Sequence, residues 1–243
     1  MFEILKNIMN NNENNTLNNN ANSVHRILKT DIKKDPNLEE DEIIFGCGCF
    51  WGAEKCFWKL PGVITTSVGY AGCKKNNPTY YEVCSGITGH SEVVRVIWDK
   101  KEIDISDLLK MFWECHDPTQ KNRQGNDMGT QYRSAISYKN ENNIKAIMAS
   151  KEQYQKELNK KNLGLIKTEI KKIDSYFYAE QYHQQYLASA GSRQYCSASP
   201  TKVKLGIFTG SNYKLEDHIW ENFNWEVDKC VLRSDNNPIK NNI

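Results

Sequence analysis

The chain has 243 residues, which is enough for one sizeable domain with tails or for two small domains. Its 32 basic and 30 acidic residues give a net charge of +2 without a basic stripe, so nucleic acid is not an expected partner. No apolar run approaches the roughly 18 residues of a membrane-spanning helix. A membrane partner is therefore not expected either.

Eight cysteines raise the question of a secreted disulfide framework. Against it, the chain is long enough to form a core, and residues 1–9 lack the basic and apolar regions of a signal peptide. Cys56 and Cys115 fall inside predicted helices, which is typical of reduced core residues in an intracellular protein. We expect a cytoplasmic protein; acidic Glu3 and Glu13 fit a mitochondrial presequence poorly.

Composition divides the chain into three parts. Asn fills nine of the thirteen positions from 10 to 22, and such a polar segment buries too little apolar surface to order itself. We therefore predict a disordered Asn-rich leader over 1–41, a folded domain over 42–205 and a partly ordered extension over 206–243. The extension mixes aromatic and charged residues.

The periodicity predicts strands alternating with helices inside the domain. The predicted elements are strand 43–45, a helix after Cys49 that Pro61-Gly62 stops, strand 63–68, a helical turn 79–84, strand 91–98, a helix from N-cap Ser106 to 115, strand 131–138, helix 141–160, strand 166–173 and helix 179–190. This order favours a two-layer α+β or α/β domain over a Rossmann fold. The absence of G-x-G-x-x-G and G-x-x-x-x-G-K motifs leaves a nucleotide cofactor unsupported.

The stretch from Phe45 to Gly52 predicts a strand, a tight glycine turn and a helix that begins at Cys49. Residues 53, 56, 57 and 60 form one apolar face of that helix. A thiol at a helix N-terminus has its thiolate stabilised, and the thiolate is the reactive species. The alternative is a buried structural cysteine.

The alternation of side chains along the predicted strand 91–98 singles out Glu92. It shares a face with Val94, Val96 and Trp98, so its carboxyl group starts an otherwise apolar face. Desolvation there would raise its pKa and keep it a proton donor near neutral pH. The alternative is that Glu92 lies in water at the end of the strand.

A reactive Cys49 is compatible with several classes of site. A Cys–His hydrolase needs a base, and His90, His116 and His183 are available without a spacing that selects one. A zinc site needs about four ligands, and Cys47 with Cys49 supplies only two. A thiol redox enzyme needs a second, mobile cysteine, and Cys196 meets that requirement.

The segment Gly48-Cys49-Phe50-Trp51-Gly52 closely resembles the signature of the class A peptide methionine sulfoxide reductases, which act on methionine-S-sulfoxide. The resemblance continues, in the family's order, over roughly residues 42 to 205. Its further blocks are 57–63, 69–72, 77–80, 83–86, 88–92, 112–114, 116–118, 123–127, 129–134, 179–180 and 183–187. The family implies an α+β fold, a two-layer sandwich around a split β-α-β (ferredoxin-like) mixed sheet with flanking helices.

The resemblance also implies a role for each matching site residue. Cys49 is the implied nucleophile, and Glu92 is the acid that protonates the sulfoxide oxygen. Because that oxygen leaves poorly until it is protonated, a neutral carboxylic acid suits the chemistry. The other residues bind the substrate: Tyr80 and Tyr132 hydrogen-bond the oxygen, Asp127 supports the site, and Phe50 and Trp51 form the apolar pocket for the methyl group.

The implied redox cycle continues after methionine leaves. Cys49 is then a sulfenic acid, and Cys196 attacks it to give a disulfide that thioredoxin or dithiothreitol reduces. Many bacterial relatives carry another recycling cysteine a few residues later, where this chain has Lys204, and Cys230 is a possible substitute. The expected partners are thioredoxin and oxidised proteins, peptides or small methionine-S-sulfoxides, with a monomeric chain, no bound cofactor and no metal.

A non-enzymatic alternative stays open. The same scaffold could serve as a zinc-binding or oxidised-peptide-binding module, and it would then bind metal or peptide without turnover. The Cys–His hydrolase is the alternative that the sequence supports least.

Overall fold

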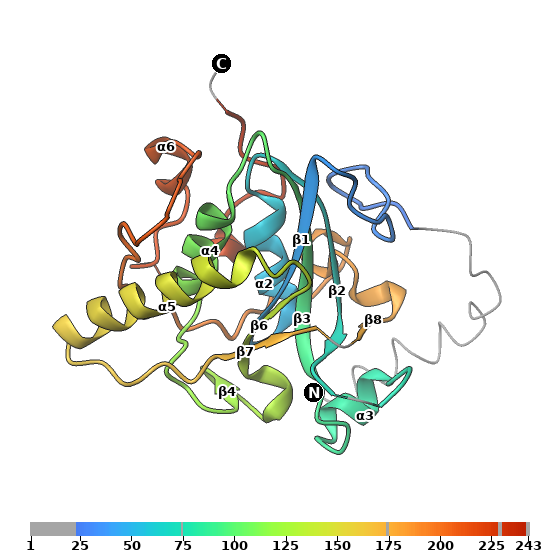
Figure 1. The fold of residues 1–243 in the computed structure, drawn as a ribbon. Coiled ribbons are helices and arrows are strands. Elements are labelled where there is room, and N and C mark those ends of the chain that lie inside the picture. Colours follow the sequence, from blue (N-terminus) through green and yellow to red (C-terminus); the bar gives the residue numbers. More distant parts are fainter. Residues whose placement is uncertain (1–22, 74, 174, 228–229, 242–243) are drawn as a thin grey trace.

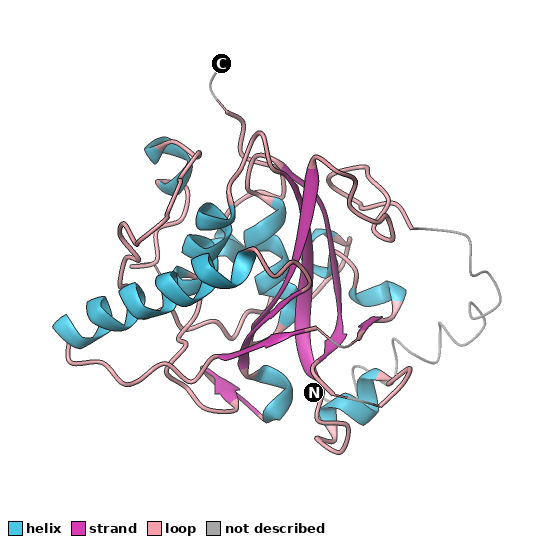
Figure 2. Cartoon of the chain, viewed as in Figure 1, coloured by secondary structure: helices cyan, strands magenta, loops and turns pink. Residues whose placement is uncertain are grey.

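The computed structural model describes residues 23–73, 75–173, 175–227 and 230–241, and its centre is a six-stranded sheet (Figure 1, Figure 2). The strand order is β7-β6-β1-β3-β2-β8. Neighbouring strands pair antiparallel except β6 and β7, so the sheet is mixed. The strands are β1 (Glu40–Cys47), β2 (Val63–Ala71), β3 (Ser91–Asp99), β6 (Ser134–Tyr138), β7 (Glu169–Lys172) and β8 (Tyr176–Tyr178).

Two helical crossovers give the sheet a ferredoxin-like topology. α2 (Phe50–Trp58) connects β1 to β2, and β3 lies between these two parallel strands. α4 (Ile105–Glu114) follows β3 and precedes β6, which pairs with the other edge of β1. The predicted α+β fold with a split β-α-β sheet is confirmed. α5 (Asn143–Lys160) packs beside α4 (Figure 1), and none of the helices in the described ranges is long and apolar enough to cross a membrane.

Aromatic side chains between the sheet and its two crossover helices form the centre of the core. Alternation along the strands sends Phe45, Val94 and Val96 to the same face, where all three are buried. The ring of Phe45 stacks on Phe57 of α2 and on Phe112 of α4, with centroids 4.9 and 5.0 Å apart. This packing fixes the position of α2 relative to β3.

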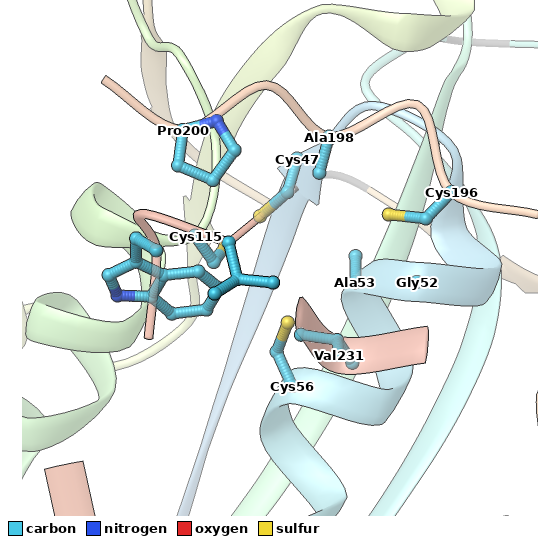
Figure 3. Close-up of a pocket in the computed structure, with 11 residues that line it drawn as sticks. Cys47, Gly52, Ala53, Cys56, Cys115, Cys196, Ala198, Pro200 and Val231 are labelled. Carbon is cyan, nitrogen blue, oxygen red and sulfur yellow. The ribbon is translucent and has the colours of Figure 1, made fainter. Parts of the chain in front are cut away.

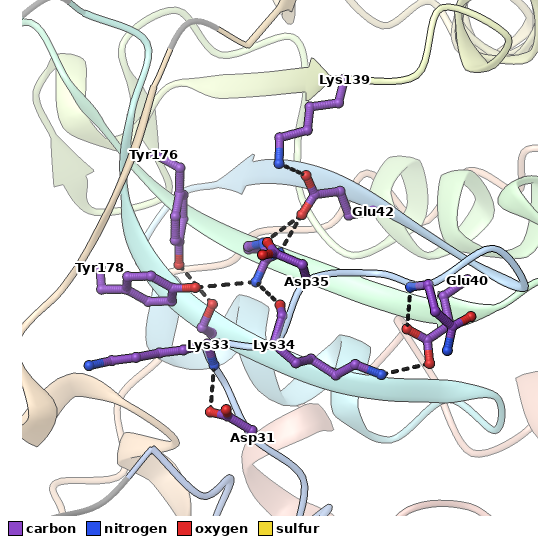
Figure 4. Close-up of polar contacts among 12 residues, drawn as sticks. Asp31, Lys33, Lys34, Asp35, Glu40, Glu42, Lys139, Tyr176 and Tyr178 are labelled. Atoms are coloured by element: carbon purple, nitrogen blue, oxygen red, sulfur yellow. Dashed lines mark hydrogen bonds and ion pairs between the residues drawn. The ribbon is translucent and has the colours of Figure 1, made fainter. Parts of the chain in front are cut away.

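The opposite face of the sheet carries a buried ion pair. Arg95 of β3 donates a hydrogen bond of 2.7 Å to the Glu42 carboxylate of β1 and one of 3.0 Å to the Lys34 carbonyl. Arg95 and Glu42 are only 5% and 3% exposed. Figure 4 shows Glu42 also paired with Lys139, and the segment that carries Lys34 lying against this face.

The structure moves the predicted boundary of the leader. Residues 1–22, which include the Asn-rich run, lie outside the described residues. A disordered leader was predicted through residue 41, but residues 23–41 pack on the domain. His25 and Ile32 are buried, and His25 Nε2 lies 2.9 Å from Thr66 Oγ1 of β2. Composition could not show this, because a few buried side chains anchor an otherwise polar segment.

The extension after residue 205 packs on the domain. Its last helix, α7 (Cys230–Arg233), lies against α2. Lys55 and Trp58 of α2 donate hydrogen bonds of 2.8 and 3.0 Å to the backbone carbonyls of Ser234 and Asn236. The helix that follows Cys49 is therefore covered along part of its length by the end of the chain.

The predicted helix over 179–190 is wrong. That segment forms two 3-10 turns, η3 (Gln181–His183) and η4 (Tyr186–Ala188). Between them Gln185 has a φ of 48°, which interrupts any helical repeat. Tertiary hydrogen bonds stabilise this conformation, because the backbone N–H and Nε2 of Gln185 donate to the buried Glu54 carboxylate at 2.8 and 2.7 Å.

Two other boundaries differ from the prediction. Asp104, not Ser106, is the N-cap of α4, since its carboxylate accepts from the Ser106 N–H at 2.9 Å. The strand predicted over 131–138 begins only at Ser134. The remaining short elements are α3 (Tyr80–Cys84), β4 (Arg123–Gln124), β5 (Asp127–Met128), η2 (Thr130–Tyr132) and α6 (Asp217–Trp220).

Replacing Arg95 with Ala should lower the free energy of unfolding by about 3 kcal/mol, because the buried Glu42 carboxylate loses its main partner. Urea denaturation measures this change. The matched control is Lys101→Ala, which breaks the exposed pair with Glu39 and should cost less than about 1 kcal/mol. Equal losses in the two variants would contradict a structural role for the buried pair.

Candidate active site

Cys49 lies between β1 and α2. It is the N-cap residue of α2, its thiol makes no side-chain capping hydrogen bond, and the backbone N–H of Trp51 lies near enough to favour the thiolate. The residue is nearly buried, with 9% of its surface exposed. The sulfur therefore lies at the positive end of a helix dipole, where little water reaches it.

Glu92 of β3 meets the same end of α2. Its Oε2 accepts a hydrogen bond of 3.0 Å from the Phe50 N–H, so the acid is bonded to the residue that follows Cys49. Glu92 is 1% exposed, on the face that strand parity predicted. Burial, together with the charges of Asp127 and Glu180, raises the pKa of Glu92 to about 8 in spite of the Phe50 bond. The carboxyl group is therefore protonated at neutral pH.

The pKa of Cys49 corrects one expectation. The helix N-terminus predicted a stabilised thiolate, but burial raises the pKa of Cys49 and the Glu92 carboxylate raises it further. The Trp51 N–H acts in the opposite direction, and burial outweighs it. Because protonation of Glu92 removes its charge, the thiolate is least unfavourable when Glu92 holds its proton.

An aromatic cluster adjoins the thiol. Trp51 stacks on Tyr186 with ring centroids 3.9 Å apart, and its Nε1–H donates to His183 Nδ1 at 3.1 Å. Burial lowers the pKa of His183 to about 3, so the imidazole is neutral with its proton on Nε2. Phe50 packs on His183 and is buried, whereas Trp51 is half-buried. Trp51 is thus the aromatic surface open to a ligand, and Phe50 supports it from inside.

Two tyrosine hydroxyls lie close to Glu92. Tyr80 begins α3, and Tyr132 ends η2. Burial is the largest cause that raises the pKa of each tyrosine hydroxyl, and the negative charge of Glu92 is the second largest. Both hydroxyls therefore stay protonated and can donate. Glu180 holds Tyr80 in place by accepting from its backbone N–H at 2.9 Å.

Asp127 is linked to the segment that carries Cys196. Its Oδ1 accepts a hydrogen bond of 2.6 Å from the hydroxyl of Tyr195. Cys196, the next residue, is buried, and its thiol is among the groups that raise the pKa of Cys49. The structure thus brings Cys196 near Cys49, although the two residues are 147 positions apart in the sequence (196 minus 49).

Two glycines make room for the Cys196 segment. A Cβ atom on Gly52, in the first turn of α2, would lie 2.5 Å from Cys196 Sγ. A Cβ atom on Gly125 would lie 2.2 Å from the carbonyl oxygen of Ser197. Any larger residue would push the segment outward, so these glycines let it lie directly against the helix that begins at Cys49.

Three supporting residues escaped the sequence reasoning. His183 anchors Trp51, Glu180 anchors Tyr80, and Tyr195 anchors the Cys196 segment to Asp127. Tyr195 is next to Cys196, and Glu180 and His183 lie in matched blocks of the family resemblance, but a positioning role depends on partners far away in the chain. Only the tertiary structure supplies those partners.

The Cys–His hydrolase alternative loses its support at this site. In the described part of the chain none of the three candidate histidines hydrogen-bonds to Cys49: His90 Nε2 pairs with the Lys75 carbonyl, His116 with the Phe112 carbonyl and Ser134, and His183 with Trp51. A Cys–His hydrolase would need such a base. The side chain of Cys230, the possible substitute recycling cysteine, lies outside the described residues.

Three features of the site are typical of a thiol-dependent oxidoreductase. A buried thiol lies at a helix N-terminus, a protonated carboxylic acid is hydrogen-bonded to the next residue, and a second thiol packs on the first helical turn. Comparison with known proteins agrees. The family model "Peptide methionine sulfoxide reductase" matches residues 41–212. This chain belongs to the peptide methionine sulfoxide reductase family.

Individual relatives support the assignment. The chain is 51% identical over 180 residues to the peptide methionine sulfoxide reductase MsrA of Vibrio vulnificus, covering 74% of this chain and 86% of that one. It is 54% identical over 166 residues to the mitochondrial peptide methionine sulfoxide reductase of Bos taurus, covering 68% and 71%. Among solved structures, methionine sulfoxide reductase A of Corynebacterium diphtheriae has a TM-score of 0.65 at 42% identity, covering 75% and 88%.

Replacing Glu92 with Gln should stabilise the protein at alkaline pH. The folded state raises the pKa of Glu92 from 4.5 to about 8, so the wild type loses stability as pH rises through that window. The amide cannot ionise, so the variant should gain up to about 4 kcal/mol at pH 9 relative to pH 4. Urea denaturation of reduced protein at both pH values measures it. A gain that is the same at both pH values would show that burial does not penalise the Glu92 carboxylate.

Proposed function

We propose that this chain reduces methionine-S-sulfoxide in proteins, peptides and small molecules, with Cys49 as nucleophile and Glu92 as general acid. The observation that carries the assignment is the Phe50 N–H bond to Glu92, which holds a protonated acid at the helix end where the thiol lies. A sulfoxide whose sulfur faces Cys49 would have its oxygen on the Glu92 side.

The first step transfers the oxygen to the enzyme. Cys49 attacks the sulfoxide sulfur while Glu92 protonates the oxygen, and the Tyr80 and Tyr132 hydroxyls donate hydrogen bonds to it. The attack forms a bond between the two sulfurs, and the protonated oxygen then moves as a hydroxyl group from the substrate sulfur to Cys49 Sγ. The S–O bond of the substrate and the new S–S bond break, so methionine leaves with its sulfur reduced and Cys49 becomes a sulfenic acid. The thiol proton of Cys49 re-protonates Glu92, so the acid ends the step as it began.

Trp51 suits the substrate's methyl group. Its indole ring is held between the Tyr186 ring and the His183 nitrogen, so the exposed part of the ring is fixed before a ligand arrives. An aromatic surface beside the thiol favours a polarisable methylsulfinyl group over a polar side chain. Specificity would then come from this apolar contact together with the two hydroxyl donors.

The second step regenerates Cys49. The Cys196 thiol attacks the sulfenic sulfur, water leaves, and a Cys49–Cys196 disulfide forms. Cys196 already lies on Gly52, one helical turn beyond Cys49, so a small movement of its segment suffices. Thioredoxin, a dithiol reductant, would then reduce the disulfide by thiol–disulfide exchange. Both thiols return to the reduced state.

Glu92→Gln should lower kcat for a methionine-S-sulfoxide peptide by roughly a hundredfold or more, because an amide cannot give a proton. The wild-type rate should also fall as pH rises through about 8, where the acid loses its proton. A coupled assay with dithiothreitol measures both. The assignment of Glu92 fails if the variant turns over at the wild-type rate.

Cys49→Ser should abolish turnover with any reductant, whereas Cys196→Ser should spare a first turnover and stop recycling by thioredoxin. In a single-turnover experiment without reductant, Cys196→Ser still yields about one methionine per chain, because Cys49 alone accepts the oxygen. Mass spectrometry should then find a sulfenic acid instead of the Cys49–Cys196 disulfide. Normal cycling of Cys196→Ser with thioredoxin would move the resolving role to another cysteine.

A further inference from the structure

Three cysteines that the proposed reaction does not use lie together in the core. Cys47 ends β1, Cys56 belongs to the second turn of α2, and Cys115 is the C-cap of α4. Each is at most 3% exposed. Hydrogen bonding with Cys115 raises the pKa of the Cys56 thiol, and hydrogen bonding with Cys47 raises that of Cys115, so Cys115 is the middle member.

The cluster opens on a small cavity. Figure 3 shows Cys47, Cys56 and Cys115 around it, with Cys196 beside Gly52 of α2. The cavity has a volume of about 20 Å³, which is room for one atom the size of a water oxygen. Its other walls are apolar or small: Gly52, Ala53, Ala198, Pro200, Trp225, Val227 and Val231. Sulfur is therefore the only strong ligand atom that these wall side chains offer.

The spacing of two of these sulfurs fits a shared metal ion. The ligand atoms of Cys47, Cys115 and His116 all lie within 4.8 Å of one another. A thiolate-bound metal lies about 2.3 Å from each sulfur, so two sulfurs about 4.6 Å apart can hold one ion between them. The Cys47–Cys115 pair needs little rearrangement to do so.

His116 is not available as a third ligand. Its Nδ1 lies 2.7 Å from the Phe112 carbonyl and its Nε2 lies 2.7 Å from Ser134 Oγ. Both ring nitrogens are thus engaged in short hydrogen bonds inside the core. Zinc, which prefers four tetrahedral ligands, would be left with too few.

We propose that Cys47 and Cys115 form a buried site for one soft monovalent cation, Cu(I). Thiolate sulfur is the ligand type that selects Cu(I), and two ligands are few for zinc or for metals that prefer oxygen. Binding exchanges two thiol protons for one cation, so the site changes from neutral to a net charge of −1. A third thiolate would make it −2 among uncharged walls, which burial disfavours. Cys56 therefore keeps its proton and stays beside the ligands.

The test uses the reduced full-length chain with Cys49, Cys196 and Cys230 changed to Ser, which removes competing thiols near the cavity and in the extension. Anaerobic titration with Cu(I) as its acetonitrile complex, followed by washing with a Cu(I) chelator and metal analysis, should leave one copper per chain. Cys47→Ser and Cys115→Ser in that background should each lower retained copper at least tenfold. Cys73→Ser, outside the cluster, is the matched control and should retain it.

Each further outcome decides a part of the proposal. Cys56→Ser should keep the copper; its loss there would overturn the two-ligand assignment. Retention of copper by both Cys47→Ser and Cys115→Ser, each shown to be folded by circular dichroism, would overturn the site. Zn²⁺ offered in place of Cu(I) should wash out, and stoichiometric zinc would overturn the choice of metal. None of these readouts depends on sulfoxide reduction, so they stand apart from the proposed activity.

Discussion

The hydrogen bond from the Phe50 N–H to Glu92 is the contact on which the site depends. It joins the start of α2 to β3, so one bond fixes the acid relative to the thiol at the preceding residue. It also favours the ionised form of Glu92, yet burial prevails and the carboxyl group stays protonated at neutral pH. The balance between these two effects gives a proton donor whose pKa lies close to physiological pH.

The packing of the core holds the Phe50–Glu92 contact in place. The stack of Phe57, Phe45 and Phe112 locks α2 and α4 onto the sheet, so the α2 N-terminus cannot move away from β3. On the other face, the Arg95–Glu42 pair joins β3 to β1. The two strands that flank the site are therefore held from both sides, while the Cys196 segment packs directly on Gly52 and Gly125.

Much of the site could be predicted because its signals are local. The strand alternation placed Glu92 on the apolar face, and the glycine turn placed Cys49 at a helix start, with the family resemblance supplying their roles. What failed depended on distant partners. Residues 179–190 have helical periodicity, but Glu54 binds both the backbone and side-chain N–H groups of Gln185, whose left-handed conformation then breaks the helix. Likewise, nothing in its own composition showed that the segment around His25 is anchored by Thr66.

The thiols of this chain show that neighbours, more than burial, decide what a cysteine does. Burial raises the pKa of Cys49, and hydrogen bonding to a neighbouring thiol together with burial raises the pKa of Cys56 and Cys115, so desolvation alone does not separate a nucleophile from a core residue. Cys49 differs because it lies at the N-terminus of α2 and a proton donor is bonded to the next residue, which allows charge to move to the substrate oxygen during attack. Cys115 has other thiols and a carbonyl as neighbours. In that environment a thiol can lose its proton only if a cation takes the proton's place.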